Sequence, residues 1–215
     1  DLGVQSFYKP LLDLLKDENL EVVKAAIQAS GKVKNEKLIQ PLIQKFIERS
    51  NENIVISALQ EAGDVSLKEI SRVLTHETLS QKQQAKLILL CGRIGTDGAT
   101  NILDELVWKT PALRMDIFHA LHLCEFKSQP HHRSRHLELM NHYISASIQI
   151  LFMIQELSKI KTTKILVDAF YLELNEIRDS LLLHFSFVYD IEKMMKAKST
   201  FALKKKESNV NGLEV

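Results

Sequence analysis

The sequence predicts an all-α fold, arranged as a right-handed stack of antiparallel helix pairs. Its 215 residues include only 7 Gly and 4 Pro, whereas a sheet protein of this size needs many more turn residues. Leu, Ile, Lys, Glu, Gln and Ala dominate the composition, and most of these residue types favour helices. A shared helix-ending pattern also returns about every thirty residues, which is typical of stacked two-helix repeats.

Four segments carry this ending, at intervals of 32, 29 and 32 residues. The first three place Gly31, Gly63 and Gly92 at corresponding positions, and Cys124 takes the same position in the fourth. An apolar residue follows two positions later in every segment. Because glycine adopts a left-handed conformation without steric cost, we expect each of the three glycines to end a helix.

Each repeat is predicted to hold two amphipathic helices, one before and one after the ending. Apolar residues at three- and four-residue steps mark one buried face on each helix. Helix starts are expected at Asn51, Ser80 and Thr110, whose side chains can accept hydrogen bonds from free backbone N–H groups. The apolar stripes are Val22, Val23, Ala26 and Ile27; Leu38, Leu42, Ile43, Phe46 and Ile47; Ile54, Val55, Ala58 and Leu59; Leu67, Ile70, Val73 and Leu74; and Ile102, Leu103, Leu106 and Val107.

The composition of the chain changes after His131: no Gly or Pro occurs again until Gly212. Two long apolar stripes in this region predict a long helical hairpin, with a turn at 158–164 and Thr163 as an N-cap. The expected organisation is four repeats over 5–128, a hairpin capping the stack over 129–195, and a tail or linker over 196–215. The stripes are Leu137, Met140, Ile144, Ile148, Leu151 and Ile154, and then Leu166, Phe170, Leu174, Ile177, Leu181, Val188, Ile191 and Met195.

Two motifs carry a resemblance to a known repeat family. The segment DENLEVVKAA at 17–26 resembles the second helix of a HEAT repeat, and CGRIGTDGA at 91–99 resembles the junction between successive HEAT units. The resemblance covers about residues 5–128. It implies a right-handed α-solenoid of the armadillo-like helical class, in which the second helices line a concave surface for a partner.

The basic residue near the start of the family's second helix matches Lys24 and Arg114. Ile56 and Ala85 stand at this position in the two middle units, so the sequence departs from the family pattern there. The resemblance implies a non-catalytic scaffold for protein–protein interaction, with no cofactor and no metal.

The partner is expected to be a protein or peptide that carries acidic groups, because the predicted concave surface is polar and modestly basic. The residues assigned to this surface are Lys24, Gln28, Gln60, Lys86 and Arg114. A formal net charge of +1 disfavours a dedicated nucleic-acid binder. The alternative is a HEAT-like DNA-binding protein or DNA glycosylase, for which Trp108 is the one available indole. A repeat-type lyase or chaperone acting on a chromophore protein is a third alternative.

Cys91 and Cys124 are too few for a disulfide framework and lie among apolar residues, which predicts free thiols in a reducing, cytoplasmic compartment. The sequence shows neither a signal peptide nor an uninterrupted run of about 20 apolar residues. The overall character of the sequence is similar to that of helical-repeat regions fused to bacterial nucleotide-translocase-like transporters. This similarity implies a module of a larger protein, tethered at the cytoplasmic face of a membrane without inserting into it.

The segment His131–His136 is the one candidate metal site. His132 and His136 lie four residues apart, on one helix face, as zinc ligands can. Arg133 and Arg135 would repel a cation, and no third ligand stands at a defined spacing, so the segment is interpreted as a polar connection. Acidic pairs such as Asp104–Glu105 are likewise interpreted as solvated helix faces rather than acid–base catalysts.

Overall fold

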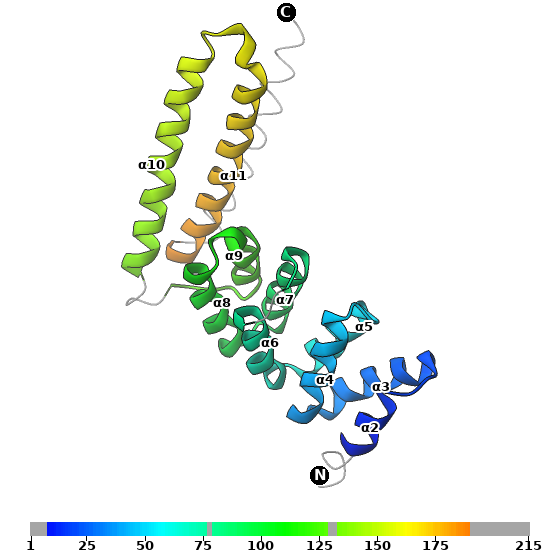
Figure 1. Ribbon diagram of the computed structural model, residues 1–215. Coiled ribbons are helices and arrows are strands. Elements are labelled where there is room, and N and C mark those ends of the chain that lie inside the picture. Colours follow the sequence, from blue (N-terminus) through cyan, green and yellow to red (C-terminus); the bar gives the residue numbers. More distant parts are fainter. Residues whose placement is uncertain (1–7, 77–78, 129–132, 190–215) are drawn as a thin grey trace, which may run out of the picture. The chain divides into compact units, whose positions relative to one another are not determined.

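The structure, a computed structural model, describes residues 8–76, 79–128 and 133–189 (Figure 1). Within these ranges the chain forms ten α-helices and two short 3-10 helices, and no strand, so the all-α prediction is confirmed. The chain divides into two compact units, Asp1–Glu125 and Phe126–Val215. No helix in the described ranges combines the length and the apolar character needed to span a membrane.

The first unit contains eight of the α-helices, most of them about three to four turns long. A 3-10 turn, η1 (Pro111–Leu113), leads into the last of them. The α-helices are α2 (Tyr8–Leu14), α3 (Leu20–Val33), α4 (Glu36–Ile47), α5 (Glu52–Ala62), α6 (Asp64–His76), α7 (Gln81–Ile94), α8 (Asp97–Lys109) and α9 (Arg114–Leu123).

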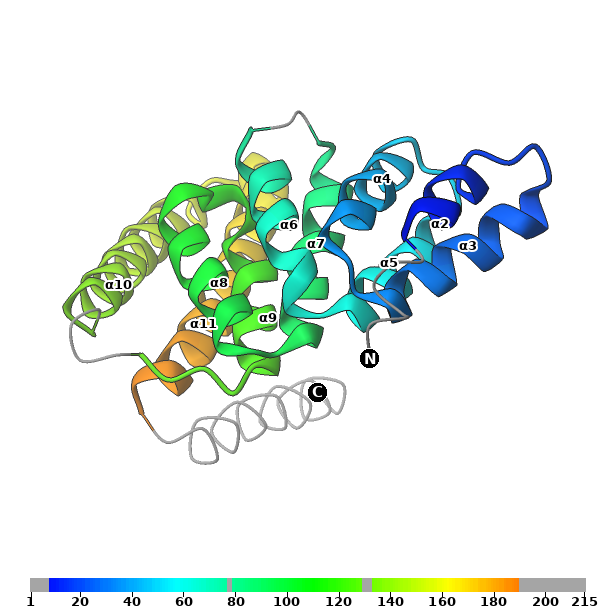
Figure 2. The same ribbon diagram turned by 90° about the horizontal axis from the view of Figure 1, so that it is seen from below.

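These helices pack in two rows that follow the order of the chain (Figure 2). One row is α3, α5, α7 and α9, and the other is α2, α4, α6 and α8. Each helix also contacts its chain neighbour in the other row, so the apolar faces meet between the rows. The fully buried side chains there include Ile27, Leu42, Leu59, Ile70, Leu87, Leu103 and Phe118.

The glycine prediction is right at one position and wrong at two. Gly63 ends α5 with φ +64°, as expected. Gly31 and Gly92, in contrast, lie inside α3 and α7, which continue to Val33 and Ile94. The left-handed residues that follow these helices are Lys34 and Gly95.

Gly31 and Gly92 serve helix packing instead. A Cβ atom at Gly31 would lie 2.5 Å from the carbonyl oxygen of Ala58 on α5. A Cβ atom at Gly92 would lie 2.8 Å from Cα of Ala120 on α9. Both distances are too short for any side chain, so these glycines let α3 approach α5 and α7 approach α9.

The expected helix starts are found at the predicted positions, with different capping chemistry. Ser80 forms a complete capping box with Gln83 at the start of α7. Asn51 precedes α5 with φ +53° and makes no side-chain capping bond. Thr110 precedes η1, and its hydroxyl donates back to the carbonyl oxygen of Leu106.

The second unit is an antiparallel helical hairpin, formed by α10 (Arg133–Leu157) and α11 (Lys164–Val188), with the 3-10 turn η2 (Lys161–Thr163) between them (Figure 1). Thr163 takes the N-cap position of α11, but its hydroxyl donates to carbonyl oxygens of the preceding turn. The predicted stripe on α10 is only partly buried: Met140 and Ile154 are buried, whereas the remaining four residues are exposed. Ile191, Met195 and the predicted tail 196–215 lie outside the described residues.

Buried histidines hold the base of the hairpin. Nδ1 of His136 and Nε2 of His184 lie 2.6 Å apart, within hydrogen-bonding distance, and both side chains are fully buried. Phe187 packs edge-on against Phe126, and the backbone N–H of Ser128 donates to the carbonyl oxygen of Phe187 at 2.9 Å. These contacts fix the segment that enters the hairpin against the end of α11.

Candidate functional site

The five predicted partner-binding residues all lie on the row formed by α3, α5, α7 and α9. Gln28 and Gln60 are exposed on α3 and α5, two helices that pack closely through Gly31. The structure therefore brings two of the predicted positions to the solvent side of one pair of neighbouring helices. They lie opposite the buried stripes of the same helices.

The three predicted cations each engage a group within the first unit. Lys24 pairs with Glu21 on its own helix at 2.7 Å. The guanidinium Nε of Arg114 donates to the carbonyl oxygen of Val107 at 3.0 Å, where α8 ends. Lys86 forms an ion pair with Glu52, which is described next. Lys86 and Arg114 thus hold neighbouring elements together, and this role was not anticipated from the sequence.

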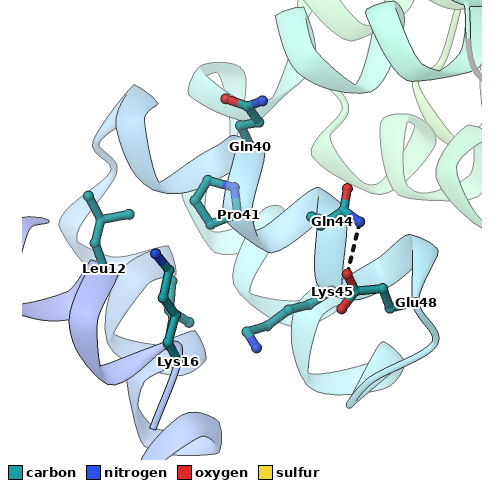
Figure 3. Close-up of a pocket in the computed structure, with 8 residues that line it drawn as sticks. Leu12, Lys16, Gln40, Pro41, Gln44, Lys45 and Glu48 are labelled. Atoms are coloured by element: carbon teal, nitrogen blue, oxygen red, sulfur yellow. Dashed lines mark hydrogen bonds between the residues drawn. The ribbon is translucent and has the colours of Figure 1, made fainter.

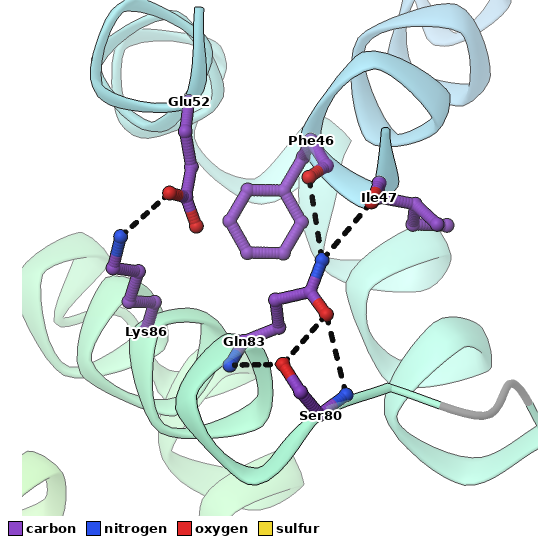
Figure 4. A network of polar contacts seen from close by, with 6 residues as sticks. All are labelled: Phe46, Ile47, Glu52, Ser80, Gln83 and Lys86. Atoms are coloured by element: carbon purple, nitrogen blue, oxygen red, sulfur yellow. Dashed lines mark hydrogen bonds and ion pairs between the residues drawn. The ribbon is translucent and has the colours of Figure 1, made fainter. Parts of the chain in front are cut away.

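Lys86 belongs to a polar network that joins α7 to the turn between α4 and α5 (Figure 4). Gln83 is buried, and its side-chain amide donates to the carbonyl oxygen of Ile47 at 3.1 Å and to that of Phe46 at 3.5 Å. Nζ of Lys86 lies 2.7 Å from the carboxylate of Glu52 at the start of α5. Polar contacts therefore take part in packing α7 onto the end of α4 and the start of α5.

A different candidate site is an open cleft of about 450 Å³ between α2 and α4 (Figure 3). Leu12, Leu15 and Pro41 provide an apolar lining, and Leu15 is almost fully buried. Lys16 lies just after α2 and Lys45 lies on α4, so each wall of the cleft contributes one ammonium group. A cleft of this size can take an amino-acid side chain or a short peptide segment.

The charges around this cleft are unevenly satisfied. Neither Lys16 nor Lys45 makes an ion pair with any residue that the structure describes. The one acid of the lining, Glu48, instead accepts a hydrogen bond of 2.9 Å from the side-chain amide of Gln44. The cleft therefore combines apolar walls with two ammonium groups that are available to an anion.

A contact between Tyr8 and Lys37 also joins the two helices that form the cleft. Nζ of Lys37 on α4 donates to the phenolic oxygen of Tyr8 on α2 at 3.1 Å, and it lies 4.7 Å from the ring centroid. This hydrogen bond lowers the pKa of the Tyr8 phenol, and the charge of the same ammonium group adds to the effect. Both groups are solvent-exposed, so the contact orients the walls more than it stabilises them.

Sequence reasoning missed the cleft because its residues come from two segments of the chain, around α2 and on α4, and belong to none of the predicted apolar stripes. Pro41 lies inside α4 and lines the cleft, and it belongs to none of the predicted stripes or motifs. Lys16 and Lys45 are 29 positions apart and share no motif. Each of these lysines stands next to an apolar residue, Leu15 or Phe46, and such neighbours are common around any amphipathic helix.

The two cysteines are free thiols in the first unit, as predicted. Burial raises the pKa of the Cys91 thiol to about 12, and burial also raises the pKa of Cys124. Sγ of Cys124, just after α9, lies 3.7 Å from the carbonyl oxygen of Gly92 on α7. The thiol therefore adds a contact where α7 and α9 pack together. Thiols held in the protonated form are poor nucleophiles.

The histidine segment does not assemble into a described metal site. His131 and His132 lie outside the described residues, and His136 turns to the buried contact with His184. Within the described ranges, no three His, Cys, Asp or Glu side chains gather closely enough to hold a metal ion. The His136–His184 contact was missed because 48 residues separate its members.

Compared with protein-family models, with curated proteins and with solved structures, the chain matches none. Its function must therefore be inferred from its own contacts, charges and exposed surfaces. Among these, the cleft between α2 and α4 is a described concave site that combines an apolar lining with two lysines that make no ion pair within the described ranges.

Proposed function

We propose that the chain is a non-catalytic scaffold of the HEAT-repeat type, a right-handed α-solenoid that binds a protein or peptide partner carrying acidic groups. Two rows of helices packed in chain order support this proposal, since each repeat then buries its apolar face against its neighbours. The close approaches at Gly31 and Gly92 give this packing its register. We infer that the protein works in a reducing, cytoplasmic compartment, where Cys91 and Cys124 remain free thiols. We also propose that the chain is a module of a larger protein and is tethered to a membrane domain.

The observation that carries the proposal is the cleft between α2 and α4. Its apolar lining suits a Leu- or Phe-sized side chain of the partner, and Lys16 and Lys45 suit a carboxylate on either side of that residue. The expected ligand is therefore a partner segment with acidic residues next to an apolar anchor. Gln28 and Gln60 on the other row offer a second, uncharged contact surface for a longer partner.

A displayed peptide library selected on the full chain tests this assignment. We expect enrichment of segments in which Asp or Glu flanks Leu or Phe, with binding that weakens as salt is raised from 50 to 200 mM. The double variant Lys16→Glu, Lys45→Glu should bind the selected peptides with an affinity at least about tenfold lower, because each substitution replaces a favourable ion contact by a repulsive one.

The matched control is Lys68→Glu with Lys82→Glu. These two lysines are exposed on α6 and α7, away from the cleft, so the net charge changes equally while the peptides should still bind. Selected peptides that bind both double variants alike would overturn the cleft assignment. Salt-dependent binding of duplex DNA at micromolar protein would instead favour the DNA-binding alternative.

A further inference from the structure

The walls of the cleft, α2 and α4, run in the same direction and keep one register. Tyr8 and Lys37, which are in contact, stand in the first turn of each helix. Eight residues further along each segment, Lys16 and Lys45 line the cleft. The backbone N–H of Lys16 still donates to the carbonyl oxygen of Asp13, so the helical winding of α2 reaches this level. The two lysines therefore stand at one level, about 12 Å along the helices from the Tyr8–Lys37 contact, at 1.5 Å per residue.

The character of the cleft changes along this length. Leu12 and Pro41 stand one turn before the lysines on the same helix faces, since residues four apart share a face. Figure 3 shows Lys16 beside Leu12, and Lys45 extending toward α2. The cleft thus presents an apolar part at one level and two ammonium groups at the next. This arrangement fits a ligand whose apolar group and anionic group are close neighbours.

We propose that the cleft binds the free carboxyl terminus of a partner protein. The last side chain of the partner lies between Leu12 and Pro41, and its α-carboxylate lies between Lys16 and Lys45. This inference rests on the proposed function, and it specifies which part of the partner enters the cleft. Two ammonium groups at one level on opposite walls can both donate to a single carboxylate, which gives charge-assisted hydrogen bonds.

An internal segment of a partner meets this geometry less well. In an extended chain, the side chains next to an anchor residue point to the opposite face, so an acidic neighbour turns away from the cleft when the anchor enters it. The α-carboxylate of a terminal residue is bonded to the same Cα atom as its side chain, so it stays at the cleft. Acidic residues further back along the partner add long-range attraction to the same lysines.

The charge of the lining also matches a single carboxylate. Two lysines and one glutamate, Glu48, leave the lining residues with a formal charge of +1. Glu48 accepts a hydrogen bond from the side-chain amide of Gln44 on its own wall, whereas neither lysine makes an ion pair within the described ranges. One carboxylate held by the two lysines therefore balances the lining.

Retention of synthetic octapeptide pools on the immobilised full chain, measured by mass spectrometry, tests the proposal. Every pool has seven residues drawn from Asp, Glu, Ser and Gly before a Leu or Phe. The first pool ends there with a free carboxyl group, the second ends there with an amide, and the third continues with Gly-Ser. We expect the first pool to be retained at least about tenfold more strongly than the other two, because only its carboxylate lies beside the apolar anchor.

The double variant Lys16→Gln, Lys45→Gln tests which cations hold the terminus. In this variant the free-acid and amidated pools should be retained within about twofold of each other, since neutral side chains no longer distinguish them. The matched control is Lys68→Gln with Lys82→Gln, two lysines exposed on α6 and α7, which should keep the tenfold preference. Circular dichroism of both variants establishes that the helices are retained.

The possible results separate this inference from the proposed function. Equal retention of all three pools would overturn the terminus assignment and leave an internal acidic segment as the ligand of the cleft. A preference for the free acid that persists in the Lys16→Gln, Lys45→Gln variant would also overturn it, because a different cation then holds the carboxylate. Retention of no pool at about 100 µM chain would overturn the cleft as a peptide site altogether.

Discussion

A Cβ atom at Gly31 would stand 2.5 Å from the carbonyl oxygen of Ala58, so only glycine fits where α3 and α5 meet. The neighbouring atom belongs to the backbone, which cannot move aside as a flexible side chain can. The same arrangement recurs between Gly92 on α7 and Ala120 on α9. Close packing within these two helix pairs therefore depends on the absence of a single carbon atom on each.

Gly31→Ala should lower the free energy of unfolding by about 2 kcal/mol, measured by urea denaturation. Alanine favours a helix over glycine by about 1 kcal/mol, but the overlap with Ala58 outweighs this gain. Gly98→Ala is the matched control and should cost less, because its Cβ would meet side chains rather than backbone: the end of Leu67 at 3.1 Å and the hydroxyl of Thr96 at 3.8 Å. A Gly31→Ala protein as stable as the wild type would show that α3 and α5 are not this close.

Gln83→Ala should destabilise the first unit by about 2 kcal/mol. It removes the capping box with Ser80 and leaves the carbonyl oxygen of Ile47 without its amide donor. Gln84→Ala, one position along the same helix, should change stability by less than about 0.5 kcal/mol. Thermal unfolding followed by circular dichroism compares the two, and equal shifts in Tm would contradict a structural role for the network.

Cys91 should resist alkylation in the folded chain. Its thiol is fully buried with a pKa of about 12, so almost none of it is thiolate at pH 8. Mass spectrometry after iodoacetamide treatment should find Cys91 unmodified in the native protein and modified in 6 M guanidinium chloride. Cys124, which is half-buried, should react at an intermediate rate. Rapid native labelling of Cys91 would show that α7 opens readily.

The same thiol makes stability depend on pH in the alkaline range. An unfolded thiol loses its proton above its ordinary pKa of 9.0, whereas the folded Cys91 keeps its proton until about pH 12. The unfolded state therefore binds fewer protons in this window, and the free energy of unfolding falls as the pH rises, by up to about 1.4 kcal/mol per unit. Cys91→Ala should lose this part of the slope, and an unchanged slope would contradict it.

His184→Leu should loosen the base of the hairpin by about 1–3 kcal/mol, because buried His136 then loses its hydrogen-bonding contact with that ring. Hydrogen exchange should rise at the start of α10 and at the end of α11, where the two residues lie. His142→Leu, an exposed position on α10, serves as the control and should leave exchange unchanged. Equal exchange in both variants would argue against a structural role for the pair.

The helical class and the helix starts after Asn51 and Ser80 could be predicted from the sequence because they depend on local patterns. Ser80 and Gln83 form a capping box and lie three residues apart, so residues within a single turn determine where α7 begins. Amphipathic spacing likewise marked Val55, Ala58 and Leu59 as one face, and the structure buries all three. The five partner-binding residues on α3, α5, α7 and α9 stay a prediction.

Tertiary structure alone decided the features that join distant positions. Gly31 was interpreted as a helix end because glycine has two uses, left-handed turns and close approach, and only the position of Ala58 distinguishes them. Lys16 and Lys45 line the same cleft although 29 residues separate them in the sequence. His136 and His184 are in contact within the hairpin although 48 residues separate them. Local periodicity determines which residues share a helix face, but which faces meet depends on how the helices pack.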